Sequence, residues 1–141
     1  MRLNKDTYLM SIAEAVAQRS TCDRASVGCV IADSHGPILC TGYNGSLSGT
    51  PHCDDVGHMT LAGRCIRTVH AEANAVAHAA RRGTPLLASV AYVTVHPCVD
   101  CAKLLASAGV TKIVFRDPYR EDTDATVDEL MAEAGVRVEA Q

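Results

Sequence analysis

Two short motifs carry residue types that bind a metal ion. The first is His70-Ala71-Glu72, and the second is Pro97-Cys98-Val99-Asp100-Cys101. Cys98 and Cys101 are one helical turn apart, so both thiolates can face one ion, and His70 can supply a third ligand. Three protein ligands leave the fourth tetrahedral position of zinc open for water, which is the catalytic arrangement of this metal. The two motifs together predict a catalytic zinc site.

Glu72 gives this site a group that can move protons. It lies on the same turn as His70 and can reach a water bound to the metal. Zinc makes such a water more acidic, and a carboxylate can both accept and donate its protons. The combination His-x-Glu followed by Pro-Cys-x-x-Cys is the signature of zinc deaminases that act on nucleobases. The expected chemistry is hydrolytic loss of an amine from C4 of a cytosine ring.

The main alternative is a closed zinc site that only holds the fold together. A Cys-x-x-Cys motif without other evidence is as readily structural or redox-active as catalytic. Here the count of three ligands and the adjacent Glu72 oppose a structural site, which normally closes with four ligands.

The elements that must position these motifs alternate between strand and helix patterns. Apolar spacing and turn residues predict helices at 6–19, 71–82, 98–108 and 125–134, and strands at 26–32, 38–43, 90–95, 112–116 and 136–139. This alternation predicts a layered α/β fold in a single domain spanning 1–141. Both metal motifs then lie at helix N-termini, where the dipole and free N–H groups favour thiolates and a developing oxyanion.

Composition narrows the function classes. The chain of 141 residues has a net charge of −3, no Trp and one Phe. A polynucleotide-binding surface is therefore disfavoured, although a local basic pocket for one phosphate is compatible with this balance. The polar N-terminus predicts neither a signal peptide nor a membrane span, so we expect a cytoplasmic protein. Seven cysteines, an odd number, favour metal binding over a disulfide framework in that compartment.

A long segment without clear periodicity, residues 44–67, separates the second predicted strand from the helix that follows His70. Such a long irregular loop inside a small domain is usually functional. Five residues of metal-binding type lie in or near it: Cys22, His52, Cys53, His58 and Cys65.

At these residues the sequence resembles the dCMP deaminase branch of the cytidine deaminase-like superfamily. The resemblance rests on Thr21-Cys22-Asp23-Arg24, on Thr41-Gly42-Tyr43-Asn44-Gly45, on the stretch 65–75 and on the region up to Tyr119. It implies a three-layer α/β/α sandwich with a mixed five-stranded sheet. It also implies hydrolysis of dCMP to dUMP and ammonia, a homo-oligomer that is often a hexamer, and control by dCTP and dTTP.

The resemblance assigns roles to single residues. Glu72 resembles the proton shuttle, and His70, Cys98 and Cys101 resemble the zinc ligands. Asn44 is similar to a contact with the sugar. The candidates for the sugar-phosphate end are Arg24, Ser26 and Tyr119. An exposed surface arginine and a turn tyrosine are the ordinary alternatives for Arg24 and Tyr119.

A second, structural zinc is also implied by the resemblance. A closed set of Cys22, Cys53, His58 and Cys65 would organise the irregular loop, with His52 as a spare that could face the substrate. The alternative is that these residues are ordinary loop residues and buried small hydrophobes.

Several competing functions stay open at this point. The substrate could be a 5-substituted dCMP, a free nucleoside, guanine or a tRNA adenosine, although the last would favour a basic surface. A nucleotide-binding module without activity and a purely structural zinc module are the non-enzymatic alternatives. Glu72 argues against the former, because losing the proton shuttle is the easiest way to lose activity.

Overall fold

A mixed five-stranded sheet forms the centre of the molecule. The computed structural model describes all residues, 1–141. The strands β1 (Gly28–Asp33), β2 (Ile38–Tyr43), β7 (Ser89–Val95), β8 (Val110–Asp117) and β9 (Arg137–Ala140) pair in the order β2-β1-β7-β8-β9. The β2-β1 and β1-β7 pairs are antiparallel, whereas β7-β8 and β8-β9 are parallel. The mixed sheet implied by the resemblance is confirmed.

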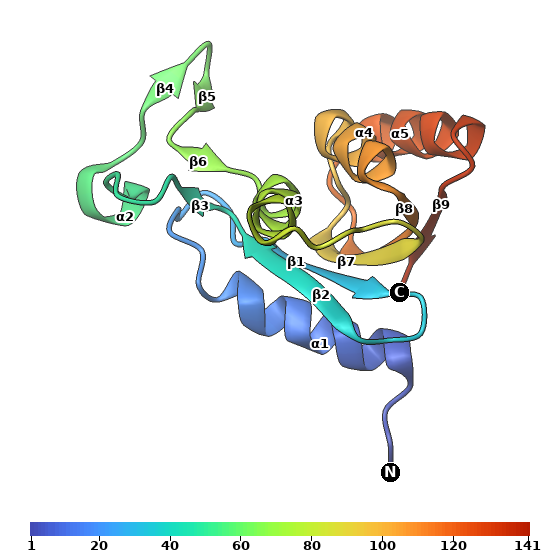
Figure 1. The fold of residues 1–141 in the computed structure, drawn as a ribbon. Coiled ribbons are helices and arrows are strands. Elements are labelled where there is room, and N and C mark those ends of the chain that lie inside the picture. Colours follow the sequence, from blue (N-terminus) through green and yellow to red (C-terminus); the bar gives the residue numbers. More distant parts are fainter.

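Helices cover both faces of this sheet (Figure 1). Helix α1 (Lys5–Ala17) packs on one face, and α3 (Ala71–Arg82), α4 (Val99–Ala108) and α5 (Glu121–Glu133) lie on the other. Strand β1 shows the reason, because successive side chains point to opposite faces. Cys29 and Ile31 join the core under α3 and α4, while Val30 and Ala32 join the core under α1. The three-layer α/β/α sandwich is thereby confirmed.

A glycine in β2 brings the first metal motif close to the sheet. A Cβ atom at Gly42 would overlap the Ala71 carbonyl and the Ala75 amide of α3. Without that atom, the first turn of α3 lies directly on β2. This close approach fixes the position of His70, which caps α3, and of Glu72 in its first turn.

The irregular segment folds into short pieces that project from the sandwich (Figure 1). We call residues 44–69 the arm. It contains β3 (Gly45–Ser46), the single helical turn α2 (Cys53–Val56), β4 (Thr60–Leu61), β5 (Arg64–Cys65) and β6 (Thr68–Val69). The β4-β5 hairpin stands furthest from the three layers. The arm therefore has little regular structure of its own.

The remaining elements agree closely with the sequence patterns, with one difference. Helix α5 begins at Glu121, four residues before the predicted start at 125. The added turn carries Glu121, Asp122 and Asp124, whose negative charges complement the positive end of the helix dipole. Because these residues are polar, the turn has no apolar periodicity that would predict a helix. None of the helices in the structure has the length and hydrophobicity needed to span a bilayer.

Candidate active site

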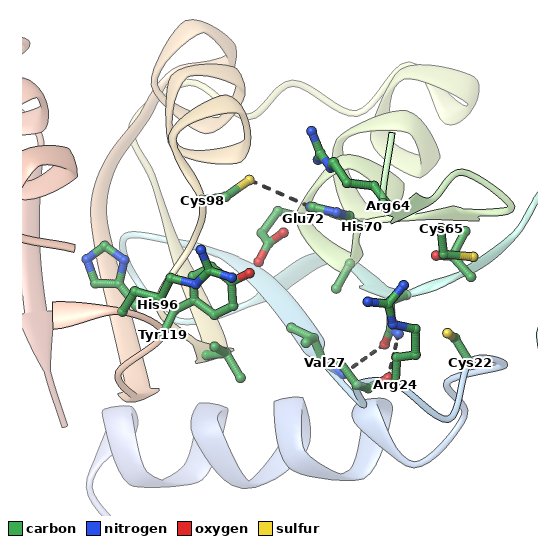
Figure 2. A pocket seen from close by; sticks show the side chains of 17 residues that line it. Cys22, Arg24, Val27, Arg64, Cys65, His70, Glu72, His96, Cys98 and Tyr119 are labelled. Carbon is green, nitrogen blue, oxygen red and sulfur yellow. Dashed lines mark hydrogen bonds between the residues drawn. The ribbon is translucent and has the colours of Figure 1, made fainter. Parts of the chain in front are cut away.

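A cavity of about 610 Å³ opens beside the two metal motifs (Figure 2). Its walls come from five parts of the chain: the segment after α1, the arm, the start of α3, the connection that follows β7, and the connection that follows β8. Glu72, His70 and Cys98 line one part of it, while Arg24 and Tyr119 line others. The fold thus brings side chains as distant in the sequence as Arg24 and Tyr119 to one cavity.

Three metal-binding side chains converge beside this cavity, and two of them, His70 and Cys98, line it. The Nδ1 atom of His70 lies 3.6 Å from the Cys98 sulfur and 3.4 Å from the Cys101 sulfur. Tetrahedral zinc, with bonds of about 2.3 Å to sulfur and about 2.0 Å to nitrogen, places such atoms about 3.5 Å apart. The three ligand atoms all lie within 4.8 Å of one another. This donor set therefore fits zinc without a fourth protein ligand.

Helix N-termini and hydrogen bonds prepare the two sulfurs for a metal. Cys98 caps α4, and Cys101 lies in its first turn. Hydrogen bonds with Cys101 and His70 hold the pKa of the Cys98 thiol at about 3, whereas the pKa of Cys101 is raised by its hydrogen bond with Cys98 and by burial. One thiolate is thus present before any metal binds, and a cation would draw the second proton from Cys101.

Glu72 lies next to the three ligands and is nearly enclosed. Its side chain lines the cavity, and the residue is only 4% exposed. Burial raises the pKa of the Glu72 carboxyl, and a hydrogen bond with Cys101 opposes that shift. A raised pKa makes the carboxylate a stronger base toward a neighbouring water, and its acid form can give the proton back.

Only two of the three residues predicted to bind the sugar-phosphate end line the cavity. Arg24 and Tyr119 are exposed and line the cavity. Ser26 is exposed as well, but it does not line the cavity, while its neighbours Ala25 and Val27 do. The structure does not bring Ser26 to the site.

Asn44 lines the cavity but is already engaged by the backbone. Its Oδ1 accepts a hydrogen bond from Val27 N at 2.8 Å, and its Nδ2 donates to Ala25 O at 2.7 Å. The residue is 7% exposed. Asn44 therefore holds the segment that carries Arg24, and one amide hydrogen is left for another acceptor.

Two further arginines border the same cavity and were missed in the sequence. Arg64 comes from the hairpin of the arm, and Arg120 follows Tyr119. The guanidinium of Arg120 lies 5.3 Å from the centre of the Tyr119 ring. With Arg24, they surround the cavity with three cations. Arg64 precedes the metal-type residue Cys65, and this adjacency was the only signal available for it.

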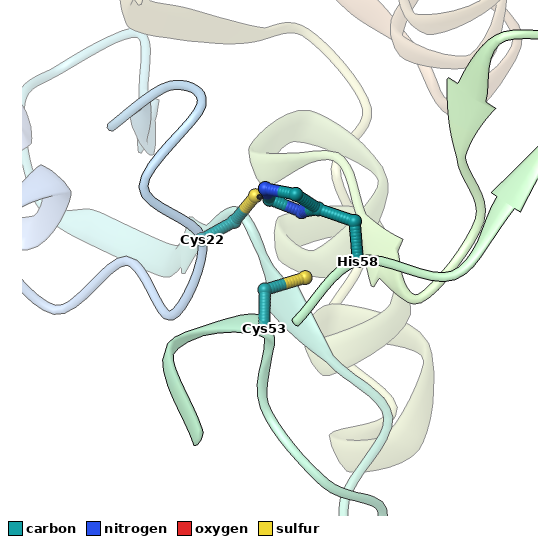
Figure 3. A group of neighbouring side chains, drawn as sticks. All are labelled: Cys22, Cys53 and His58. Atoms are coloured by element: carbon teal, nitrogen blue, oxygen red, sulfur yellow. Dashed lines mark hydrogen bonds between the residues drawn. The ribbon is translucent and has the colours of Figure 1, made fainter. Parts of the chain in front are cut away.

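A second cluster lies at the base of the arm (Figure 3). The ligand atoms of Cys22, Cys53 and His58 lie within 4.8 Å of one another, with 3.6 Å between His58 Nδ1 and the Cys22 sulfur. The Cys65 sulfur lies 3.6 Å from that of Cys53. Tetrahedral zinc would separate two sulfurs by about 3.8 Å. The structure therefore groups three residues of the predicted set, and it places the fourth, Cys65, in contact with Cys53.

The surroundings of this cluster also suit a metal. Asp23 contacts the other ring nitrogen of His58 at 3.0 Å, which is how carboxylates commonly orient a ligating histidine. Although burial opposes it, hydrogen bonds with the backbone of Arg67 and Met59 lower the pKa of Cys65 to about 6. His52 is exposed at the start of α2 and lines neither the cluster nor the cavity.

Known proteins with similar sequences share nearly the whole chain. ComE operon protein 2 of Bacillus subtilis is 37% identical over 138 residues, which cover 98% of this chain and 71% of that protein. The deoxycytidylate deaminase of enterobacteria phage T2 is 30% identical over an alignment of 172 residues, covering 95% of this chain and 90% of that enzyme.

A solved structure and a family model agree with this similarity. The dCMP deaminase of cyanophage S-TIM5, crystallised with dCMP and dUMP, matches with a TM-score of 0.84 and 31% identity, covering 100% of this chain and 99% of that one. The model of the family described as the cytidine and deoxycytidylate deaminase zinc-binding region matches residues 3–117, which include both metal motifs. The chain therefore belongs to the zinc-binding cytidine and deoxycytidylate deaminase family.

Proposed function

We propose that this protein hydrolyses dCMP to dUMP and ammonia. The observation that carries the proposal is the convergence of His70, Cys98, Cys101 and Glu72 on a cavity that three arginines border. The first four residues suit the removal of an amine, and the arginines suit a phosphate. The phage T2 relative is named a deoxycytidylate deaminase, and the S-TIM5 enzyme is described in complex with dCMP and dUMP.

Glu72 would manage the protons of the reaction. Zinc held by His70, Cys98 and Cys101 would supply a Lewis acid that makes water a nucleophile near neutral pH. The Glu72 carboxylate would accept a proton from the attacking water and deliver it to ring N3 of the cytosine. It would then take the second proton, from the new hydroxyl on C4, and pass it to the departing amine as the C4 carbonyl forms. One water is consumed and one ammonia is released. The raised pKa and the burial of the Glu72 carboxyl support this proton exchange.

The other residues of the cavity would hold the nucleotide. Arg24 can form two charge-assisted hydrogen bonds with the phosphate, because its guanidinium presents a planar pair of donors. Tyr119 and the remaining amide hydrogen of Asn44 are within the same cavity and are candidates for the sugar. A free nucleoside would leave the three arginines without an anion, so we expect the monophosphate to be preferred.

We also propose that Cys22, Cys53, His58 and Cys65 hold a second, structural zinc. The sulfur and nitrogen separations, the thiolate character of Cys65 and the contact between Asp23 and His58 support it. Four protein ligands would close the coordination sphere and give the arm a fixed core that its short strands do not supply.

Self-association is a further proposal for the same chain. Large apolar side chains are exposed along the arm, at Leu47, Val56, Met59, Leu61 and Ile66. Such a concentration commonly marks a protein interface, and we propose a homo-oligomer in which neighbouring subunits cover the arm. The hexameric state and the control by dCTP and dTTP stay predictions from the family resemblance. The seven unpaired cysteines suit the cytoplasmic location that we expect.

Ammonia release from dCMP, deoxycytidine, CMP and dCTP, each with and without a zinc chelator, tests the main proposal. We expect turnover of dCMP to exceed that of the other three and to stop with the chelator. Turnover of deoxycytidine at an equal rate would contradict the role of the arginines. No turnover of any of them, with zinc restored and dCTP added as an activator, would contradict dCMP as the substrate.

A further inference from the structure

A buried histidine links two walls of the cavity. His96 follows β7 directly, leads into Pro97-Cys98, and is 2% exposed. Its Nδ1 lies 2.9 Å from Pro97 O and 3.3 Å from Asp124 Oδ1, and its Nε2 lies 2.7 Å from Asp128 Oδ1. All three partner atoms are oxygens, and each of the two ring nitrogens faces at least one of them. Phe115 packs edge-on against the ring with 4.8 Å between the ring centres.

Asp124 extends this link to the opposite wall. Its Oδ2 accepts a hydrogen bond from Tyr119 N at 2.8 Å, and its Oδ1 accepts one from Arg120 N at 3.2 Å. Asp124 is 8% exposed although it lies in the first turn of α5. One carboxylate therefore holds the backbone turn at residues 119–120 and contacts His96 at the same time.

An ordinary helix cap explains only part of this arrangement. The first N–H groups of a helix need acceptors, and Arg120, which caps α5, supplies none from its side chain. Asp124 does not meet that need for the helix itself, because it accepts from the N–H groups of Arg120 and Tyr119, which stand at the cap and just before it, much as in a capping box. Capping does not require the carboxylate to contact a buried histidine next to Cys98, nor a second carboxylate, Asp128, on the far side of the same ring.

The side chains at the turn depend on this backbone anchor. Tyr119 is 53% exposed, and its only side-chain interaction within the chain is the stacking with Arg120. Both side chains border the cavity, and Figure 2 shows Tyr119 there. Their positions relative to Cys98 are therefore set through the backbone that Asp124 holds, and through His96.

We propose that Asp124 is a positioning residue that, together with His96, fixes the Tyr119–Arg120 wall against the zinc-binding loop and thereby sets the affinity for the sugar-phosphate end of the nucleotide. Asp128 would orient the His96 ring from the other side. This inference rests on the proposed function, because it concerns how the same cavity holds its substrate.

The variant Asp124→Asn tests the proposal, with Asp122→Asn as the matched control. The amide keeps the size of the carboxylate but loses its charge and one acceptor. We expect the KM for dCMP to rise about tenfold or more with kcat changed much less, because hydrogen bonds to a charged group are lost at the anchor. The side chain of Asp122 makes no hydrogen bond in the structure, and that variant should match the wild type.

Hydrogen exchange supplies a readout that does not depend on turnover. In Asp124→Asn, the amides of Tyr119 and Arg120 should exchange faster than in the wild type, while those of β7 stay protected. If Asp124→Asn does not fold, Asp128→Asn at the half-exposed partner should show the same changes at about threefold in KM. Faster exchange with an unchanged KM would reduce Asp124 to a helix cap and overturn the proposal, as would no change in either quantity.

The two proposals can fail separately. Normal dCMP turnover with no effect of Asp124→Asn would overturn the positioning role alone. Absence of dCMP turnover in the wild type would overturn the proposed function, and the exchange rates at Tyr119 and Arg120 would then still decide whether Asp124 holds the turn.

Discussion

The two cysteine-histidine clusters differ in the structure that holds them. His70, Cys98 and Cys101 stand at the first turns of α3 and α4, which are packed on the central sheet. The second cluster joins Cys22, after α1, to residues of the arm, where the longest element is a single helical turn. Helices packed on the central sheet hold the first site. The second cluster lies outside these layers, where only short elements and loops surround it.

The numbers of protein ligands that we propose for the two clusters also differ. Three ligands beside a buried glutamate leave room for a reacting molecule, whereas the second site as we propose it, with Cys65 joining Cys22, Cys53 and His58, would leave none. The first cluster therefore suits chemistry, and the second suits cross-linking of a segment that lacks its own packing. Both lie next to one cavity, since Cys22 and Cys65 line it together with His70 and Cys98.

Replacing the glutamate should have the largest effect on the first cluster. We expect Glu72→Ala to lower kcat for dCMP by about a hundredfold to ten-thousandfold, because a positioned acid-base group contributes about that much. Metal content and the unfolding temperature should stay close to those of the wild type. Near-normal turnover in this variant would remove Glu72 from the reaction and with it the distinction between the clusters.

Replacing Arg24 should give a smaller and more selective loss. This residue stands two positions after Cys22, between the two clusters, and lines the cavity. We expect Arg24→Ala to raise the KM for dCMP about tenfold to a hundredfold, the value of a charge-assisted hydrogen bond to an anion. The kinetic constants for deoxycytidine should change little. An equal loss for both substrates would show that Arg24 does not bind the phosphate.

Alkylation of the cysteines should reveal the difference in ligand count without any assay of activity. The pKa is lowered to about 3 at Cys98 and to about 6 at Cys65, whereas burial raises it to about 11 at Cys40. After the metals are removed in mildly acidic buffer, we expect iodoacetamide to label Cys98 and Cys65 well before Cys40.

The order of labelling during slow chelation would then separate the two sites. A chelator can enter the open coordination position of the first site, so Cys98 should become reactive before Cys65. Mass spectrometry of digested samples follows both residues at once. If Cys65 is labelled first, the second cluster is not the closed site that we propose.

The sequence predicted the first cluster because each of its two motifs lies within one helical turn, which a local pattern is enough to predict. Helix patterns place His70 and Glu72 on one turn and Cys98 and Cys101 on another, and the alternation of strands and helices brings the two turns to one edge of the sheet. The boundaries of α3 agree with the prediction. The start of α5 differs, because its first turn is acidic and has no apolar pattern.

The wall residues could not be predicted in the same way. Arg64 reaches the cavity through a hairpin of two-residue strands, which has no detectable period. Ser26 does not line it although both of its neighbours do, and the sequence pattern around it gives no sign of that difference. The link from His96 to Asp124 joins residues 28 positions apart. It depends on how α5 packs against β9 and α4, and this tertiary packing cannot be read from a local pattern.

The most direct test of the account compares Cys101→Ser with Cys53→Ser in zinc content, kcat at saturating dCMP and unfolding temperature. Each variant should lose one zinc per chain. We expect Cys101→Ser to lose turnover while keeping an unfolding temperature close to that of the wild type, and Cys53→Ser to unfold at a lower temperature while keeping much of its kcat. The reverse pattern, or loss of turnover in both with no loss of zinc in Cys53→Ser, would contradict the division between a chemical and a structural metal site.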